Sequence, residues 1–246
     1  MIAYIARRLA QIVLVLFSVS VLVFVLLQLA PGDPATIMAG ESTSVEELKN
    51  IREKLGLNKP IHVQYFIFIN GLFNGELKSY SYEQSAISVI LERVPATFEL
   101  GLFAFLLAIL VSIPAGIISA IKQNSVLDYI VTSVALLGVS TPVFWTALML
   151  MLLLSIQFGL LPVSGRGETF MGLSILTKNG LRHIIIPAIA LSSVQMAMNT
   201  RLTRSSMLET LREDYVTTAR SKGIKEYWVI MRHAFRNAIL PVMTNV

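Results

Sequence analysis

Long apolar blocks separate the polar parts of this chain. A helix needs about 20 apolar residues to cross the hydrocarbon core of a membrane. Stretches of that kind, free of Asp, Glu, Lys and Arg, occur at residues 9–31, 100–121, 130–158 and 183–200. A fifth apolar run opens at residue 237. The pattern therefore predicts an all-α polytopic membrane protein, with four full spans and the start of a fifth.

The third predicted span belongs to an uncharged run, 129–165, that is too long for a single crossing. We expect it to be bent or broken near Pro142, because proline removes a backbone hydrogen bond and permits a bend. Pro114 and Pro187 also fall within spans. Bends at these prolines are compatible with two roles, lining a pathway or simple packing.

The segment between the first two spans, residues 32–98, is polar enough to lie outside the membrane. Its pattern predicts three short helices: one from a capping box at Ser44-Val45-Glu46-Glu47 to Gly56, one beginning at Pro60, and one over 85–94 stopped at Pro95. Two roles are open for this segment, a cover on the outer mouth of the protein or a docking surface for a delivery protein.

Composition and charge agree with a membrane protein. Of the 246 residues, 54% are hydrophobic and 14% are charged, whereas globular domains carry about a quarter charged residues. Eight Lys and Arg residues lie between Thr200 and Asn237, against three between the third and fourth spans. Since basic residues collect on the cytoplasmic side, we expect a cytoplasmic N-terminus. The net charge of +5 then requires no nucleic acid partner.

Ten mostly apolar residues follow Arg236, which is too few to cross a membrane. We therefore expect the native chain to continue for roughly another sixty residues, enough to complete the fifth span and add a sixth.

The basic segment 201–236 contains the most informative stretch of the chain. Asp214 is a suitable N-cap, and Gly223 suits the left-handed position that closes a helix. We expect a short helix over 215–222, with an ordinary membrane-surface loop as the alternative. An amphipathic helix should follow along the membrane surface, with its apolar side made by Tyr227, Trp228, Met231, Phe235 and Ile239.

Catalytic and metal-binding patterns are absent from the sequence. There is no phosphate-binding Gly-x4-Gly-Lys-Ser/Thr loop, no His-Glu-x-x-His and no cysteine. The histidines, His62, His183 and His233, are scattered, so no metal site is expected. The predicted spans also lack the ionisable side chains that ion-coupled carriers keep inside the membrane. Energy for any transport must then come from elsewhere.

Several stretches resemble the permease subunits of ABC importers, and most closely their dipeptide, oligopeptide and nickel branch. The basic segment resembles the cytoplasmic EAA loop of these permeases at Asp214-Tyr215-Val216-Thr217-Thr218-Ala219-Arg220-Ser221-Lys222-Gly223 and at His233-Ala234-Phe235-Arg236-Asn237-Ala238-Ile239-Leu240-Pro241. Similar agreement is found at residues 4–9, 29–34, 138–142 and 203–206. One departure is Thr217-Thr218-Ala219, which stands where the general pattern has Glu-Ala-Ala.

The resemblance implies a non-catalytic, six-span subunit of a bacterial inner membrane importer. Its partners would be a second homologous permease, two ATPase subunits that hold ATP and Mg, an extracytoplasmic solute-binding protein and the lipid membrane. It implies an ATPase-coupling loop formed by Asp214, Tyr215, Thr218, Ala219, Arg220, Lys222 and Gly223. It also implies a surface helix after that loop, with His233, Arg236, Asn237 and Pro241. No cofactor of its own is implied for this chain.

Other readings remain open at this point. One alternative is an ion-gradient-driven carrier, which would need intramembrane charges. The other is a membrane scaffold or enzyme subunit, and an enzyme subunit would need a catalytic cluster. For an importer, peptides of two to several residues are the first expectation for the solute. Nickel or a nickel chelate comes second and glutathione third. The sequence does not identify substrate-binding residues.

Overall fold

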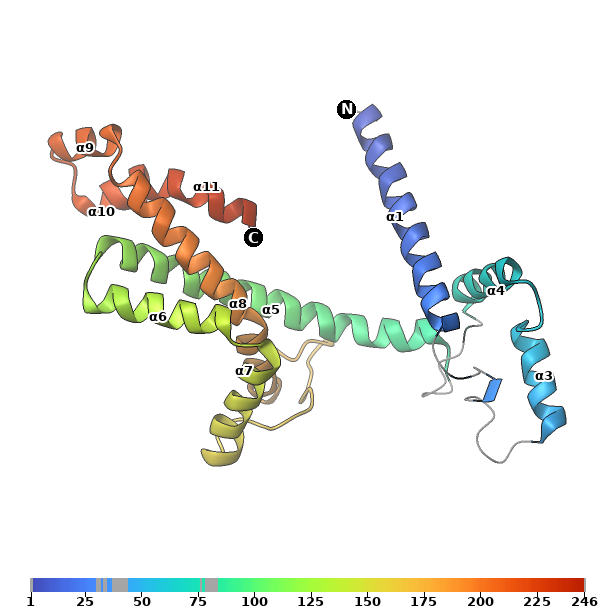
Figure 1. Cartoon of the computed structure of the whole chain (residues 1–246). Helices are drawn as coiled ribbons and strands as arrows, with labels where there is room; N and C mark the ends of the chain where they lie inside the picture. The colour runs from blue at the N-terminus through green and yellow to red at the C-terminus, as the bar shows by residue number, and fades with distance from the viewer. Residues whose placement is uncertain are drawn as a thin grey trace. The chain divides into compact units, whose positions relative to one another are not determined.

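The computed structural model describes residues 2–29, 32, 35–36, 44–75, 77 and 84–245. No β-strand occurs among these residues, and an isolated bridge joins Phe170 to Leu173. The chain divides into two compact units, residues 1–93 and 94–246. Helix α5 (Ala86–Ile121) begins in the first unit and continues into the second (Figure 1).

The first unit contains α1 (Ile2–Leu29), α3 (Val45–Leu55) and α4 (Ile61–Asn74). Helix α4 packs on α1 through aromatic rings, with the centroid of Tyr65 5.5 Å from that of Phe24 and Phe68 5.8 Å from the same ring. The hydroxyls of Ser20 and Tyr65 lie 2.7 Å apart and form a hydrogen bond between the same two helices. These contacts fix the register of α4 against α1.

The predicted capping box at the start of α3 is confirmed. The Ser44 hydroxyl accepts from the Glu47 N–H, and the Glu47 carboxylate accepts from the Ser44 N–H. The helix ends at Gly56, whose φ of 67° is the left-handed conformation that glycine adopts without a steric penalty. Helix α4 begins at Ile61, so Pro60 immediately precedes the helix and is not its first residue as expected.

The prediction of a separate helix ending at Pro95 is wrong. Helix α5 runs without interruption through Pro95 and Pro114 to Ile121. Proline inside a helix removes one backbone hydrogen bond, and that loss can be tolerated where the rest of a long apolar helix is intact. The predicted outer segment 32–98 therefore includes the first turns of α5, whose helix is much longer than the predicted span 100–121.

The second unit continues with α6 (Val126–Ser140), α7 (Val143–Leu150), the π-helical segment η1 (Met151–Gln157) and α8 (Lys178–Thr210). The third predicted span is broken as expected: α6 and the α7–η1 pair meet at Pro142 with a bend of 112°. Pro187, by contrast, lies inside the continuous helix α8.

Helix α8 extends beyond the predicted span 183–200 at both ends. Its last ten residues, which include Arg201 and Arg204, were assigned to the cytoplasmic segment on charge alone. Basic side chains are good helix formers, so their charge sets where a helix leaves the hydrocarbon core rather than where the helix ends.

Three helices, α1, α5 and α8, are long and apolar enough to cross a membrane, and a fourth span results if the bent pair is counted as one. Within the second unit, α5 and α8 approach closely at Gly116, where an added Cβ would lie 2.6 Å from the Cβ of Thr203. Helices α6 and α8 approach at Gly138, where an added Cβ would lie 3.1 Å from the Cβ of Ala197. Small residues at such crossings are typical of helix packing in membranes.

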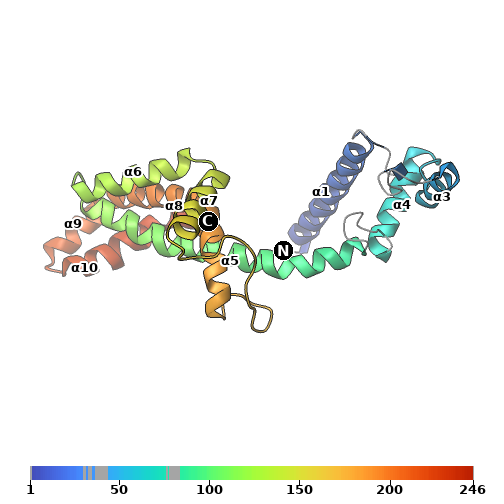
Figure 2. The same cartoon turned by 90° about the horizontal axis from the view of Figure 1, so that it is seen from below.

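After α8 the chain forms α9 (Asp214–Ser221), α10 (Glu226–Trp228), the π-helical segment η2 (Val229–Ala234) and α11 (Phe235–Asn245). Figures 1 and 2 show α9 and α10 together at one end of this unit, near the C-terminal end of α5 and the start of α6. This end of the unit contains the predicted coupling loop.

Candidate functional site

The short helix α9 begins one residue earlier than predicted. Glu213 has an extended backbone and precedes the helix, and the N–H groups of Val216 and Thr217 both donate to its carbonyl oxygen. Asp214 is therefore the first helical residue, and the expectation that it is the N-cap is wrong. Its carboxylate still lies in the first turn, where negative charge is favourable for the helix dipole.

Helix α9 ends at Ser221, one residue earlier than predicted, and the left-handed glycine that follows it is confirmed. Gly223 has a φ of 74°, and its N–H donates to the carbonyl oxygen of Arg220 at 2.9 Å. A Cβ added at Gly223 would meet no atom within 4 Å. The requirement for glycine here thus comes from the backbone conformation and not from crowding.

One side of α9 is buried. Val216 and Ala219 are 0% and 5% exposed and belong to an apolar cluster. The other buried members of this cluster are Ile117, Ala120, Met207, Val229, Ile230, Ala234 and Ala238. Because these residues come from α5, α8, η2 and α11, α9 shares one buried cluster with four other elements.

The opposite side of α9 is exposed. Of the predicted coupling residues, Asp214, Tyr215, Thr218, Arg220, Lys222 and Gly223 are exposed, and only Ala219 is buried. Ala219 can therefore support the helix but cannot contact a partner. The role assigned to the exposed residues stays a prediction.

Polar contacts tie α9 to the segment that follows it. The Asn237 side-chain amide donates to the Tyr215 hydroxyl at 2.8 Å, and this hydroxyl donates to the His233 carbonyl oxygen at 3.4 Å. The sequence grouped these residues in two separate motifs, and the structure brings them together. His233 participates through its backbone, so nothing in this contact depends on the imidazole.

An ion pair joins the end of α9 to the start of α10. Arg220 donates from Nη2 to a Glu226 carboxylate oxygen at 2.8 Å, and its Nε lies 3.2 Å from both carboxylate oxygens. Hydrogen bonding and the positive charge of Arg220 hold the pKa of Glu226 below its ordinary value. The pair spans the turn at Gly223 and links the end of α9 to the start of α10.

The predicted apolar side of the segment after α9 is confirmed only in part, since Met231 and Phe235 pack, partly buried, against the apolar cluster. Tyr227 and Trp228 are 65% and 50% exposed, and their rings contact each other. The buried side consists of Val229, Ile230, Ala234, Ala238 and Val242. The π-helical turn of η2 changes the angular spacing of its residues, so a face projected with α-helical periodicity is displaced. Arg236 and Pro241 are exposed.

Buried ionisable side chains are the feature that sequence reasoning missed. Glu99 on α5 and Asp128 on α6 are 4% and 2% exposed. Their partners, Arg166 and Arg204, are more than sixty residues away along the chain. The sequence gives no local signal for such pairs. Both carboxylates lie just outside the predicted spans 100–121 and 130–158, in helices that extend beyond those bounds.

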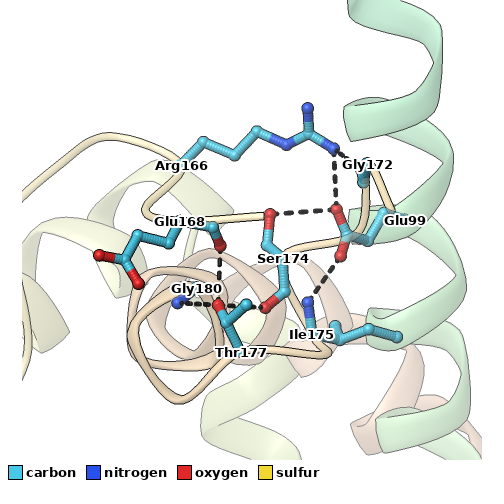
Figure 3. Close-up of polar contacts among 8 residues, drawn as sticks. All are labelled: Glu99, Arg166, Glu168, Gly172, Ser174, Ile175, Thr177 and Gly180. Carbon is cyan, nitrogen blue, oxygen red and sulfur yellow. Dashed lines mark hydrogen bonds and ion pairs between the residues drawn. The ribbon is translucent and has the colours of Figure 1, made fainter. Parts of the chain in front are cut away.

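Glu99 fastens the loop between η1 and α8 to α5 (Figure 3). Its carboxylate accepts from the Ile175 N–H at 2.8 Å, from the Ser174 hydroxyl at 3.2 Å and from Arg166 at 3.1 Å. Arg166 also donates to the Gly172 carbonyl oxygen at 2.6 Å. A single buried carboxylate thus receives donors from the middle of the loop and from its C-terminal end.

Among the residues that the structure describes, no cluster of three or more His, Cys, Asp or Glu side chains is placed to hold a metal ion. The described part of the chain therefore offers binding surfaces and helix contacts, and the candidate site is the supported helix α9.

Comparison with known proteins gives two family matches. Residues 112–246 match the family described as binding-protein-dependent transport system inner membrane component, and residues 1–101 match the corresponding N-terminal family. The dipeptide transport system permease protein DppB of Alkalihalophilus pseudofirmus is 39% identical, over 100% of this chain and 79% of that protein.

Two further relatives are similar. The di/tripeptide transport system permease protein DppB of Pseudomonas aeruginosa is 39% identical over 99% of this chain and 78% of its own length. A putative peptide transport system permease protein of Brucella suis is 41% identical over 99% of this chain and 77% of its own length.

Proposed function

Because the chain belongs to the family of binding-protein-dependent transport system inner membrane components, we propose that it forms half of the pathway through which an ABC importer takes up short peptides. The role as a non-catalytic importer permease follows from the family. The peptide substrate is supported by the relatives, which are named as dipeptide, di/tripeptide and peptide permeases.

The proposed contact for the ATPase is the exposed side of α9. The observation that carries this proposal is the division of α9 into two faces: Val216 and Ala219 are buried in an apolar cluster shared with four other elements, while Arg220 and Lys222 remain exposed. A helix of this length is marginal alone in water, so its position depends on that support. Force applied to the exposed face would pass directly to the helices beneath it.

The proposed complex contains a second, related permease, two ATPase subunits and an extracytoplasmic binding protein. ATP binding would move α9, and the movement would reorient the pathway. Such coupling requires that the ATPase binds α9 differently in the two states of the pathway.

Two cysteine variants test the ATPase contact and the orientation together, since residues 1–246 contain no cysteine. Ser221→Cys lies at the exposed end of α9, and Ser164→Cys lies in the exposed loop after η1. We expect the cysteine at 221 to react only with reagents applied to the cytoplasmic side and to cross-link to the ATPase. The cysteine at 164 should react only from outside and form no such cross-link.

Labelling of both cysteines from the same side would contradict the proposed orientation. An ATPase cross-link from residue 164 in place of residue 221 would contradict the proposed contact.

Uptake assays test the proposed substrate. In cells without other peptide importers, the complete transporter should accumulate a labelled dipeptide, and excess unlabelled dipeptide should compete. Nickel and glutathione serve as alternative labelled solutes. Accumulation of either of these, with no dipeptide uptake, would overturn the assignment to peptides.

A further inference from the structure

A buried ion pair joins α6 to α8 at the end of the bundle that carries α9. Arg204 donates from Nε to one oxygen of Asp128 and from Nη2 to the other, each at 2.7 Å. The Asp128 side chain is 3% exposed. A two-point contact between guanidinium and carboxylate fixes orientation as well as distance.

The same carboxylate also binds α5 and the turn that follows it. The Ser119 hydroxyl of α5 donates to Asp128, and the Asn124 N–H donates to it at 3.0 Å. Asp128 therefore receives donors from α5, from the turn between α5 and α6, and from α8. One side chain ties together the three helices of the bundle.

This junction lies next to the support of α9. Ser119 stands between Ile117 and Ala120 in α5, and both of those residues belong to the apolar cluster beneath α9. On α8, Met207 is in the same cluster and follows Arg204 by three residues, about one helix turn. On both α5 and α8, the residues of the ion-pair junction are thus close neighbours of residues in the apolar cluster beneath α9.

Helix α6 itself contributes no residue to the apolar cluster beneath α9 in the part of the chain that the structure describes. At its other end α6 packs on α8 at Gly138 and then leads into the 112° bend at Pro142. A displacement of α9 therefore reaches α5 and α8 through the shared apolar cluster. It reaches the near end of α6 through Asp128 and its donors.

We propose that Asp128 and Arg204 are positioning residues for energy coupling, which make α6 move with α5 and α8 when α9 is displaced. This inference rests on the proposed function of α9 as the ATPase contact. Stability alone is a weak reason for such a pair, because well-packed apolar residues often replace a buried ion pair without loss. A fixed register between three helices is what the two-point geometry provides.

The test uses the complete importer, with its second permease, ATPases and binding protein, in proteoliposomes. ATP hydrolysis and labelled dipeptide uptake are measured in the same vesicles for Asp128→Asn and for Arg204→Lys. Glu168→Gln is the matched control, because it removes a carboxylate from an exposed position of the same unit.

We expect Asp128→Asn to assemble and to hydrolyse ATP, while the uptake per ATP falls about tenfold, within the usual range for coupling between sites. Arg204→Lys keeps the charge but loses the planar fork, and should lower the same ratio. Glu168→Gln should leave the ratio unchanged.

An unchanged ratio in Asp128→Asn overturns the proposal, whether both activities persist or both fall in proportion. Should Asp128→Asn fail to assemble, Arg204→Lys decides in the same way. Failure of the proposed ATPase contact is seen separately, because the cysteine at position 221 would then give no cross-link in a chain with Asp128 and Arg204 intact.

Discussion

At the scale of single residues, Gly223 is the clearest test of α9. Its φ of 74° is strained for other residues, and no neighbouring atom crowds it. Gly223→Asp adds strain and places negative charge at the negative end of the helix, at a cost of roughly 1–2 kcal/mol. We expect normal membrane insertion but lost ATPase co-purification and lost uptake.

The control at this position is Gly223→Asn, because asparagine tolerates the left-handed conformation and carries no charge. It should retain most ATPase association. If Gly223→Asp itself binds the ATPase and transports normally, Gly223 is only a surface turn.

Gly116 tests the packing of α5 on α8. An added Cβ would lie 2.6 Å from the Cβ of Thr203 and 2.8 Å from the carbonyl oxygen of Thr200, so the two helices must separate. Gly116→Val should lower stability by about 1–3 kcal/mol, the usual cost of overpacking. Thermal unfolding in detergent measures this cost.

Gly101 provides the matched control on the same helix, since a Cβ there meets no atom within 4 Å. Gly101→Ala should leave stability unchanged or raise it slightly, because alanine favours helices. Equal destabilisation by the two substitutions would show that the close approach at Gly116 does not matter.

Sequence patterns were informative at residues whose backbone conformation is unusual. Gly56 and Gly223 both adopt the left-handed conformation expected of helix-closing glycines. The side-chain partners of Asp128 and Glu99 were beyond reach, because each pair is formed by residues far apart in the chain. No local pattern distinguishes a buried carboxylate from an exposed one.

At the scale of elements, Glu99 holds the loop before α8 in place. Glu99→Gln removes the charge that the Arg166 and Ile175 donors share. We expect faster hydrogen exchange over residues 166–177, with the Ile175 amide most affected, because that N–H loses a charged acceptor. Glu92→Gln, at an exposed position of α5, should leave exchange in the loop unchanged.

Unaltered exchange at Ile175 in Glu99→Gln would show that the loop is held by its other contacts.

The Arg220–Glu226 pair predicts a pH dependence at the end of α9. The pKa of Glu226 is lowered in the folded protein. The ion pair therefore contributes its full stabilisation of the fold at pH values above the ordinary glutamate pKa of about 4.3. This stabilisation is lost as the pH falls through the lowered pKa of Glu226. The side chains are 40% and 56% exposed, so we expect a coupling energy of about 0.2–1 kcal/mol at pH 7.

A double-mutant cycle with Arg220→Gln and Glu226→Gln, followed by thermal unfolding at pH 7 and pH 3, measures that energy. A coupling that is equal at the two pH values would contradict the ion pair.

The elements that the sequence predicted well have strong local signals, such as the capping box of α3 and the break at Pro142. The predictions were wrong where a proline or a basic residue lies inside a long continuous helix. Pro95 does not end α5, and basic residues do not end α8. The π-helical turn of η2 displaced the buried side of the following segment, because a face projected with α-helical periodicity does not fit it.

At the scale of the whole molecule, the hydropathy pattern and the motifs around α9 were sufficient to predict an all-α membrane protein of the importer permease family. The family match and the helices long enough to cross a membrane agree with that prediction. Hydropathy works this well because the bilayer permits few backbone structures. The buried pairs that organise the bundle depend on tertiary contacts and needed the structure.

The central claim is that peptide import through this subunit is driven by ATP hydrolysis on partner subunits. Its most direct test is uptake of a labelled dipeptide by proteoliposomes that contain the complete transporter. We predict uptake that requires ATP on the side of α9 and the binding protein on the opposite side, and that persists when an ionophore collapses ion gradients. Uptake without ATP that the ionophore abolishes would contradict the account.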